Sequence, residues 1–322
     1  MNSQHMKAKR KLRVAVVMGG PSAEHDVSLE TGKNVVANLD RRRYAVLPVV
    51  VSRRGRWPMS IDELKQNCDL VFISMHGEYG EDGTVQKLLE AHRIHYTGSG
   101  AAASALGMDK FASATRFSRA GLLVPQFRRA TSATRARAAA TALGLPMAVK
   151  PVDRGSSIGV SIVHKASELA VALKNARRCS NNVIVQEYIA GTELTCAVLE
   201  MRGKPKALPV IEIVPKANTF FDYRAKYESG GSDEIVPARI GAKTARAVQR
   251  AAIAAHRAIG CSGYSRTDFI LATDGTLYVL EINTLPGLTQ NSLLPKAAAA
   301  AGISFPKLLD TIIKNALTDT RS

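Results

Sequence analysis

The chain has 322 residues, which is more than one small hydrophobic core needs and suits two or three α/β lobes. Its 46% hydrophobic and 22% charged residues are ordinary for a globular protein. No apolar run approaches the ~18 residues of a membrane span and no signal peptide is visible, so we expect a cytoplasmic protein without a membrane partner. The four cysteines are scattered without a Cys-x-x-Cys pair, which favours reduced, buried side chains.

The charge is strongly positive, with 44 Lys and Arg against 27 Asp and Glu and a net charge of +17. Such a balance is typical of nucleic-acid binding. Here the basic residues are spread over many segments and lack interleaved aromatic residues, which are only 5% of the chain. We therefore expect a solvated basic surface and no nucleic-acid partner. A positive field also suits polyanionic nucleotide substrates.

The first 100 residues alternate between strand and helix patterns. Strands are predicted at 13–18, 44–51 and 69–74, and helices at 27–39 and 83–92. This alternation indicates parallel βαβ units. Gly98-Ser99-Gly100, followed by a small-residue helix at 101–106, is interpreted as a hinge, so the first lobe is predicted to span 1–100.

Two further lobes are predicted at 101–184 and 185–322. The central one contains a helix at 110–120, an Arg/Ala-rich helix, strands at 146–150, 160–163 and 183–188, and a Gly/Ser-rich loop at 153–159. The last one contains a hairpin around Arg202-Gly203-Lys204, a polar loop at 219–234, a helix at 243–258, a second hairpin and a C-terminal helix. The fold class predicted from this pattern is α/β.

The second hairpin carries the clearest site. Strand-like runs at 264–271 and 276–283 flank Asp274-Gly275, a strong turn signal. A two-residue turn there places Asp268 opposite Glu281 and Arg266 opposite Asn283, with all four side chains on one face. Opposed carboxylates repel each other.

Two interpretations of this face are open. A divalent cation held by Asp268, Glu281 and the Asn283 amide oxygen fits the oxygen ligands that Mg²⁺ prefers. Alternatively, Arg266 forms an ordinary salt bridge with one of the carboxylates. The following turn, which ends at Gly287, either brings a bare backbone N–H close to a reacting oxygen or is a plain turn.

The hairpin segments Arg266-Thr-Asp268 and Glu281-Ile-Asn283-Thr-Leu-Pro-Gly287 resemble the ATP-grasp superfamily, and more narrowly the D-alanine–D-alanine ligase family. The resemblance extends from Gly19 to the C-terminal helix. Further matching motifs occur in the family order: Gly19-Gly-Pro-Ser-Ala-Glu24, Val27-Ser-Leu, Met75-His-Gly-Glu-Tyr-Gly-Glu-Asp-Gly83, Tyr96-Thr-Gly-Ser-Gly100, Met108-Asp-Lys110, Val149-Lys-Pro151, Arg154-Gly-Ser-Ser-Ile-Gly159, Phe221-Asp-Tyr-Arg-Ala-Lys-Tyr227 and Gln290-Asn-Ser-Leu293.

The resemblance implies an ATP-grasp fold of three lobes, with an N-terminal Rossmann-like parallel sheet and ATP between the central and C-terminal lobes. It implies ligation of two D-alanines through a D-alanyl phosphate, for peptidoglycan precursor synthesis. The implied cofactors are ATP and Mg²⁺ or Mn²⁺, with two ions, and the implied assembly is a homodimer. Chemistry of this kind depends on positioning and electrostatics.

The resemblance also assigns roles to individual residues. For the D-alanines, these are Glu24 on the first ammonium, His76 near the first substrate, Arg266 and the Gly287 N–H as the oxyanion hole, and Ser292 with Leu293 on the second carboxylate. For ATP phosphates, they are Lys110, Lys150, Lys226 and the loop of Ser156 and Ser157, with Ser156 bonded to Tyr227. For adenosine, they are Gln186, Glu187, Tyr188, Ile189 and Glu193.

Plainer interpretations stand beside several of these roles. Glu24 fits an ordinary helix-start carboxylate, His76 a routine loop residue, and the Gly/Ser-rich loop a simple connection. Gln186 departs from the glutamate common in the family, although its carbonyl still accepts from an adenine amino group. The rival functions are a D-alanine–D-lactate ligase, which the resemblance disfavours because Tyr227 is present, another ATP-grasp carboxylate–amine ligase, and a non-enzymatic nucleotide-binding protein.

Overall fold

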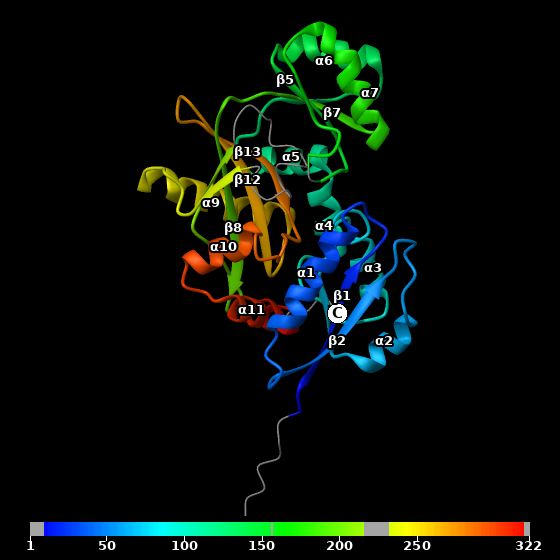
Figure 1. The fold of residues 1–322 in the computed structure, drawn as a ribbon. Coiled ribbons are helices and arrows are strands. Elements are labelled where there is room, and N and C mark those ends of the chain that lie inside the picture. The colour runs from blue at the N-terminus through cyan, green and yellow to red at the C-terminus, as the bar shows by residue number, and fades with distance from the viewer. Residues whose placement is uncertain (1–9, 156, 216–231, 319–322) are drawn as a thin grey trace, which may run out of the picture.

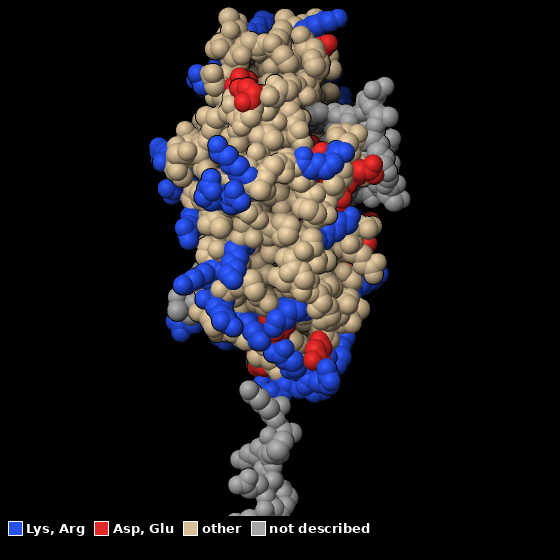
Figure 2. All heavy atoms as spheres, turned by 90° about the vertical axis from the view of Figure 1, so that its left-hand side faces the viewer, with Lys and Arg blue, Asp and Glu red and all other residues tan. Residues whose placement is uncertain are grey.

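The computed structural model describes residues 10–155, 157–215 and 232–318. In this part of the chain the strands form three sheets, which lie one after another along the molecule (Figure 1). None of the described helices combines the length and the apolar character that a membrane crossing requires. Lysines and arginines lie over much of the face in Figure 2 and are densest at its lower end, where some acidic side chains lie among them.

The first sheet is parallel, as the alternation of strands and helices predicted. Its central strand is buried almost from end to end, which is typical of a strand covered on both faces. Its strands, in the order β2-β1-β3, are β1 (Leu12–Gly19), β2 (Tyr44–Val51) and β3 (Leu70–Ile73). The helices of this region are α1 (His25–Asn38), α2 (Ile61–Asn67) and α3 (Thr84–Ala91).

The second sheet is antiparallel and has its own hydrophobic core, drawn only from residues 130–185. Its strands, in the order β4-β7-β5-β6, are β4 (Phe127–Arg129), β5 (Met147–Pro151), β6 (Ser161–Val163) and β7 (Val183–Glu187). The helices beside it are α6 (Ala133–Leu143), a 3-10 turn (Ala166–Glu168) and α7 (Leu169–Cys179). At the top of Figure 1 this unit stands apart from the rest.

The third sheet is antiparallel throughout its described strands. They are β8 (Gly191–Met201), β9 (Lys204–Ala207), β10 (Ile211–Pro215), β11 (Ser232–Ile235), β12 (Tyr264–Ala272) and β13 (Leu277–Asn283). The predicted loop 219–234 is wrong at its end, because Ser232 to Glu234 pair with β10; the rest of that loop lies outside the described residues. The helices that pack on this sheet are α4 (Ala101–Met108), α5 (Lys110–Arg119), α9 (Ala242–Ile259), α10 (Leu293–Ala300) and α11 (Phe305–Thr318).

The first and third sheets share one hydrophobic core. Buried residues of β1 and β3 belong to the same cluster as residues of β8, α10 and α11. The C-terminal helix α11 therefore packs against the N-terminal lobe, on α1 (Figure 1) and on β3. This packing brings the ends of β3 and β13, which are far apart in the sequence, to one cavity.

Candidate active site

The β12–β13 hairpin has the register predicted at the site but a different turn. Arg266 pairs with Asn283 and Asp268 with Glu281, as predicted. The two-residue turn was wrong, because Ala272 N–H donates to Thr276 O and leaves a loop of three residues. Gly275, at φ +87, takes the left-handed position that closes such a loop. A β-bulge beyond Asp268 shifts the register back by one residue, so the two deviations cancel at the site.

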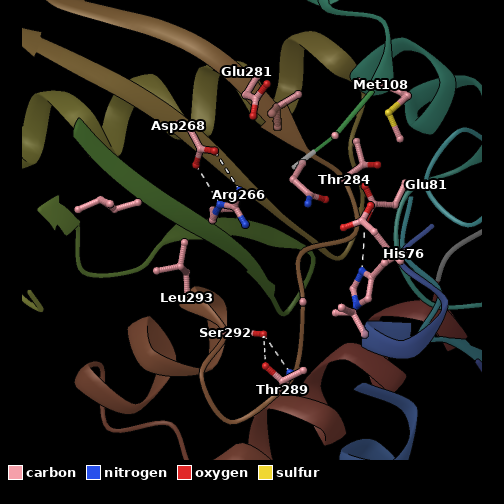
Figure 3. A pocket seen from close by; sticks show the side chains of 18 of the residues that line it. His76, Glu81, Met108, Arg266, Asp268, Glu281, Thr284, Thr289, Ser292 and Leu293 are labelled. Atoms are coloured by element: carbon pink, nitrogen blue, oxygen red, sulfur yellow. Dashed lines mark hydrogen bonds and ion pairs between the residues drawn. The ribbon is translucent and has the colours of Figure 1, made fainter. Parts of the chain in front are cut away.

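The two opposed carboxylates are each neutralised by a cation from the protein. Arg266 donates from Nε to Asp268 Oδ1 and from Nη2 to Oδ2, both at 2.9 Å (Figure 3). Thr195, the neighbour of Asp268 on β8, donates to the same Oδ1 at 2.6 Å. Lys110 at the start of α5 lies 3.4 Å from Glu281 Oε2. The salt bridge of the plainer interpretation is therefore present.

The same residues also fit a divalent cation. Asp268, Glu281 and Asn283 all line one cavity and offer two carboxylates and an amide oxygen, which are ligands that Mg²⁺ accepts. The Asn283 Oδ1 already accepts from Leu285 N–H at 2.7 Å, which fixes the direction of the amide. No three His, Cys, Asp or Glu side chains gather as a metal cluster in the described residues, so a cation here depends on this mixed donor set.

Glu24 closes the cavity from the side of the first sheet. It is the N-cap residue of α1 and is buried, yet its carboxylate does not cap the helix. A Cβ at Gly77, whose φ is +71, would lie 2.8 Å from Glu24 Oε2. Only glycine therefore lets the loop after β3 pass so close to this carboxylate.

His76, directly beyond β3, is held on both ring nitrogens. Its Nδ1 is 3.2 Å from Glu81 Oε1 (Figure 3). Its Nε2 is 2.9 Å from Thr31 Oγ1. Burial and the nearby charge of Glu24 raise the pKa of the Glu81 carboxyl, and its bond to His76 only partly opposes them. Sequence reasoning gave no role to Thr31 or Glu81, although Glu81 stands in a matched motif five residues after His76.

The turn after β13 completes the cavity. A Cβ at Gly287 would lie 2.8 Å from Ser292 Oγ and 3.8 Å from His76 Cε1. Ser292 is the N-cap of α10, but its hydroxyl bonds Thr289 instead of the helix (Figure 3). The Ser292 side chain therefore does not accept a hydrogen bond from the first N–H groups of α10, which begin at Leu293. Such N–H groups at a helix N-terminus favour an anion.

Some of the predicted nucleotide residues line the cavity and others lie outside its lining. Lys110 and Glu193 line the cavity, and Gly155 reaches it from the Gly/Ser-rich loop. Outside the cavity lining lie Lys150, Ser157, Gln186, Glu187, Tyr188 and Ile189. Outside the described residues lie Ser156, Lys226 and Tyr227.

Two of the predicted nucleotide residues on the second sheet contact each other. Lys150 on β5 donates to Gln186 Oε1 on β7 at 2.9 Å. Gln186 is buried, and its neighbour Glu187 accepts from Gln126 N–H at 3.1 Å. The glutamine that replaces the common glutamate therefore still serves as an acceptor, here toward a lysine.

The Gly/Ser-rich loop is tied to its surroundings by Arg154. This guanidinium forms an ion pair with Glu78, in the loop that carries His76, and donates from Nε to Cys179 O at 2.7 Å. Lys110 Nζ donates to the Arg154 carbonyl at 2.5 Å. The loop thus links the second sheet to the first.

The chain is similar to known proteins over most of its length. The family profile described as "D-ala D-ala ligase C-terminus" matches residues 117–314, and the one described as "D-ala D-ala ligase N-terminus" matches 13–67 and 58–99. A D-alanine–D-alanine ligase of Anaeromyxobacter dehalogenans (strain 2CP-C) is 47% identical over 311 residues, which is 94% of this chain and 96% of the relative.

Two solved structures are similar over most of the chain. The D-alanine–D-alanine ligase of Bacillus anthracis, complexed with ATP, has a TM-score of 0.81 at 36% identity and covers 95% of this chain and 97% of its own. The VanG D-Ala:D-Ser ligase of Enterococcus faecalis has a TM-score of 0.83 at 32% identity and covers 95% of this chain and 100% of its own.

Proposed function

The chain belongs to the D-alanine–D-alanine ligase family, and from this premise we propose that it joins two molecules of D-alanine while ATP is converted to ADP and phosphate. The product, D-alanyl-D-alanine, serves peptidoglycan precursor synthesis. One observation carries the proposal: a single cavity receives Glu24 and His76 from the first sheet and Arg266, Asp268 and Glu281 from the third. It therefore offers an anion for an ammonium at one side and cations and metal ligands at the other.

The first step requires the carboxylate of the first D-alanine to attack the γ-phosphate of ATP, which gives D-alanyl phosphate and ADP. We assign Glu24 to the ammonium of that substrate, because its buried carboxylate faces the cavity. Lys110 and Lys150 hold phosphates. A cation held by Asp268, Glu281 and Asn283 supplies positive charge for the transferring phosphoryl group when it is bound.

The second step requires the amine of the second D-alanine to attack the acyl phosphate, and phosphate leaves. We assign the resulting oxyanion to Arg266 and the Gly287 N–H. The two bonds from Arg266 to Asp268 hold the guanidinium plane in place before substrate arrives. Ser292 and the Leu293 N–H, at the N-terminus of α10, hold the second carboxylate.

The remaining assignments complete the ATP site. Adenine lies against Gln186 and the backbone of 187–189, and Glu193 binds the ribose. Ser156, Ser157, Lys226 and Tyr227 close over the phosphates, with Tyr227 favouring an amine as second substrate. We keep three lobes, 1–100, 101–184 and 185–322, and a homodimer as parts of this proposal.

Phosphate release tests the proposed function. We expect phosphate release with ATP, Mg²⁺ and D-alanine. We expect no increase in phosphate release when D-lactate or D-serine is added at equal concentration. The products of the three mixtures are separated by mass spectrometry, which tells a dipeptide from an ester. A chain that releases no phosphate in a D-alanine-dependent way would overturn the proposal, and an ester or a D-alanyl-D-serine product would change the acceptor. Light scattering of the same preparation measures the oligomeric state.

A further inference from the structure

Glu81 lies in the wall of the cavity beside the proposed first-substrate site. It lines the same cavity as Glu24 and His76, and its side chain is 13% exposed. Its Oε1 is 3.2 Å from His76 Nδ1. Glu81 thus adds a second carboxylate to the side of the cavity where an ammonium is expected.

The surroundings of His76 leave its ring little freedom. Thr31 on α1 holds Nε2, Glu81 holds Nδ1, and the backbone N–H of His76 donates to Ser28 Oγ at 2.8 Å. The Cε1 edge of the ring faces Gly287, the proposed oxyanion donor. The imidazole therefore lies between the proposed first-substrate site and the turn after β13.

An ionised carboxylate only accepts hydrogen bonds, so a bond from Glu81 requires the hydrogen on Nδ1. Nε2 of the neutral ring then accepts from the Thr31 hydroxyl. Thr31 can donate here, because a hydroxyl serves as donor or acceptor. The two partners thus specify one tautomer between them, because the hydrogen bond at one ring nitrogen decides which nitrogen carries the hydrogen.

We propose that Glu81 is a positioning residue of the first-substrate site, which holds His76 as the Nδ1–H tautomer and forms with Glu24 an anionic wall for the substrate ammonium. The identity of that substrate rests on the proposed function. The inference goes beyond that function because it gives a role to Glu81 and Thr31, two side chains that contact His76. The electrostatic cost of two neighbouring carboxylates agrees with this role, because the nearby charge of Glu24 raises the pKa of Glu81 and a bound ammonium relieves that cost.

Nitrogen NMR of histidine-labelled protein tests the tautomer without turnover. Spectra are recorded in mildly alkaline buffer, where free imidazole is neutral, and His76→Gln identifies the His76 signals. We expect a protonated Nδ1 and an unprotonated Nε2 in the unchanged chain. Glu81→Ala is expected to move the hydrogen to Nε2, whereas Glu81→Gln keeps it on Nδ1 because the amide oxygen still accepts. A hydrogen on Nε2 in the unchanged chain would overturn the proposal.

Kinetics of the same variants test the positioning role. Glu81→Ala is expected to lower kcat/KM for the first D-alanine by about 10-fold to 100-fold, as for loss of a buried hydrogen bond to a charged group, with KM for ATP unchanged. Glu81→Gln is expected to raise KM for D-alanine while kcat stays within a few-fold. Thr31→Val is expected to show part of the loss in kcat/KM for D-alanine, and Thr31→Ser, which keeps the hydroxyl, is expected to show little loss.

Three results separate the outcomes. Equal kinetic constants in Glu81→Ala and the unchanged chain would overturn the proposal even if the tautomer is as expected. If Glu81→Ala does not fold, Glu81→Gln, the Thr31 pair and the NMR of the unchanged chain still decide. A chain that fails to use D-alanine contradicts the proposed function, while its His76 tautomer is still measured.

Discussion

The cavity end of the molecule and the second sheet are packed in different ways. At the cavity, the first and third sheets share one hydrophobic cluster, which includes Leu285 and Leu288 on either side of Gly287. The second sheet packs on its own cluster from residues 130–185. The groups proposed for D-alanine and metal therefore stand on a common core, whereas Lys150 and Gln186 stand on a unit that packs independently.

This difference separates two kinds of preorganisation. A shared core holds the distances among Glu24, His76, Arg266 and Gly287 without help from a ligand. The distance from these groups to Lys150 depends instead on the orientation of the second sheet, and relative motion is the default between independently packed units. Changes at the cavity are thus expected to act on kcat or on the use of D-alanine, and changes on the second sheet on the affinity for ATP.

The largest effect is expected at the paired carboxylates. Glu281→Ala removes a proposed metal ligand, and turnover is expected to fall by at least ~10³-fold because bound metal supplies several kcal/mol of charge stabilisation. Asp268→Asn is expected to behave similarly while it keeps an acceptor for Arg266 and Thr195. Phosphate release measures turnover, and thermal unfolding is expected to stay within a few degrees for Glu281→Ala.

Asp274→Asn is the matched control for this prediction. Asp274 is an exposed acid in the turn of the same hairpin, and asparagine retains its acceptor for Thr276 N–H. Its turnover is expected to equal that of the unchanged chain. Turnover that survives Glu281→Ala would mean that the hairpin is structural and would remove the contrast between the two regions.

A smaller effect is expected from Lys150→Ala on the second sheet. The loss of one cation for phosphate is expected to raise KM for ATP by about 10-fold to 100-fold, since a charged hydrogen bond is worth about 1.5–3 kcal/mol. KM for D-alanine is expected to change little. Lys174→Ala, an exposed lysine on α7 beside the same sheet, is the control. A change confined to KM for D-alanine would contradict the division between the regions.

The ion pair of Arg154 and Glu78 joins the two regions, and its effect is expected to be smaller still. Its side chains are 29% and 46% exposed, so the coupling is at most about 1 kcal/mol. Arg154→Ala and Glu78→Ala are each expected to raise KM for ATP by up to about fivefold, and the double variant no further. High salt is expected to reduce the difference.

Tryptophan fluorescence gives a second measurement of the Arg154–Glu78 contact. Trp57 is the one tryptophan of the sequence, and it donates to Tyr79 Oη at 2.8 Å, one residue from Glu78. Its emission is expected to change in Arg154→Ala if the pair holds the loop in place. Additive effects in the double variant together with unchanged emission would show that the two regions are not coupled through Arg154.

How far the sequence could predict the structure differs from region to region. The parallel sheet and the hairpin register followed from local signals, namely buried apolar runs and an Asp-Gly turn. The register predicted for the hairpin was correct partly because two unexpected features, the three-residue loop and the bulge, shift it in opposite directions. Local signals also existed for two helices that were missed: the Ser60-x-x-Glu63 capping box of α2, and the apolar spacing of α7, with Leu169, Ala172, Leu173 and Ala176 buried.

Other features had no local signal. Glu81 belongs to a matched motif, but its role depends on the position of Thr31, which lies on a different element. The Arg154–Glu78 pair joins two loops 76 positions apart whose own sequences show nothing of the contact. Such contacts follow from how the lobes pack on one another, and a pattern read along the chain does not contain that information.

The smallest effect on catalysis, with a clear effect on stability, is expected at Asp310, which anchors α11 to β2. Its side chain is 6% exposed and meets Tyr44 Oη at 2.6 Å, Arg43 Nη1 at 2.5 Å and Lys314 Nζ at 2.9 Å. Burial alone raises the pKa of Asp310, but these contacts outweigh burial and hold it below its ordinary value. Since this anchor closes the shared core, Asp310→Asn is expected to lower the free energy of unfolding by about 1–3 kcal/mol.

The pH dependence identifies the cause of that loss. A carboxyl whose pKa is lower in the folded protein contributes stability above the unfolded value of about 3.9, and the contribution disappears as the pH falls through the folded pKa. Urea unfolding is therefore expected to show the full difference between Asp310→Asn and the unchanged chain near neutral pH and a shrinking one below about pH 4. Asp62→Asn, an exposed acid on α2, is expected to show no such difference. A loss that does not vary with pH would assign the anchor to packing alone, and a raised KM for ATP would show that the second sheet depends on the shared core after all.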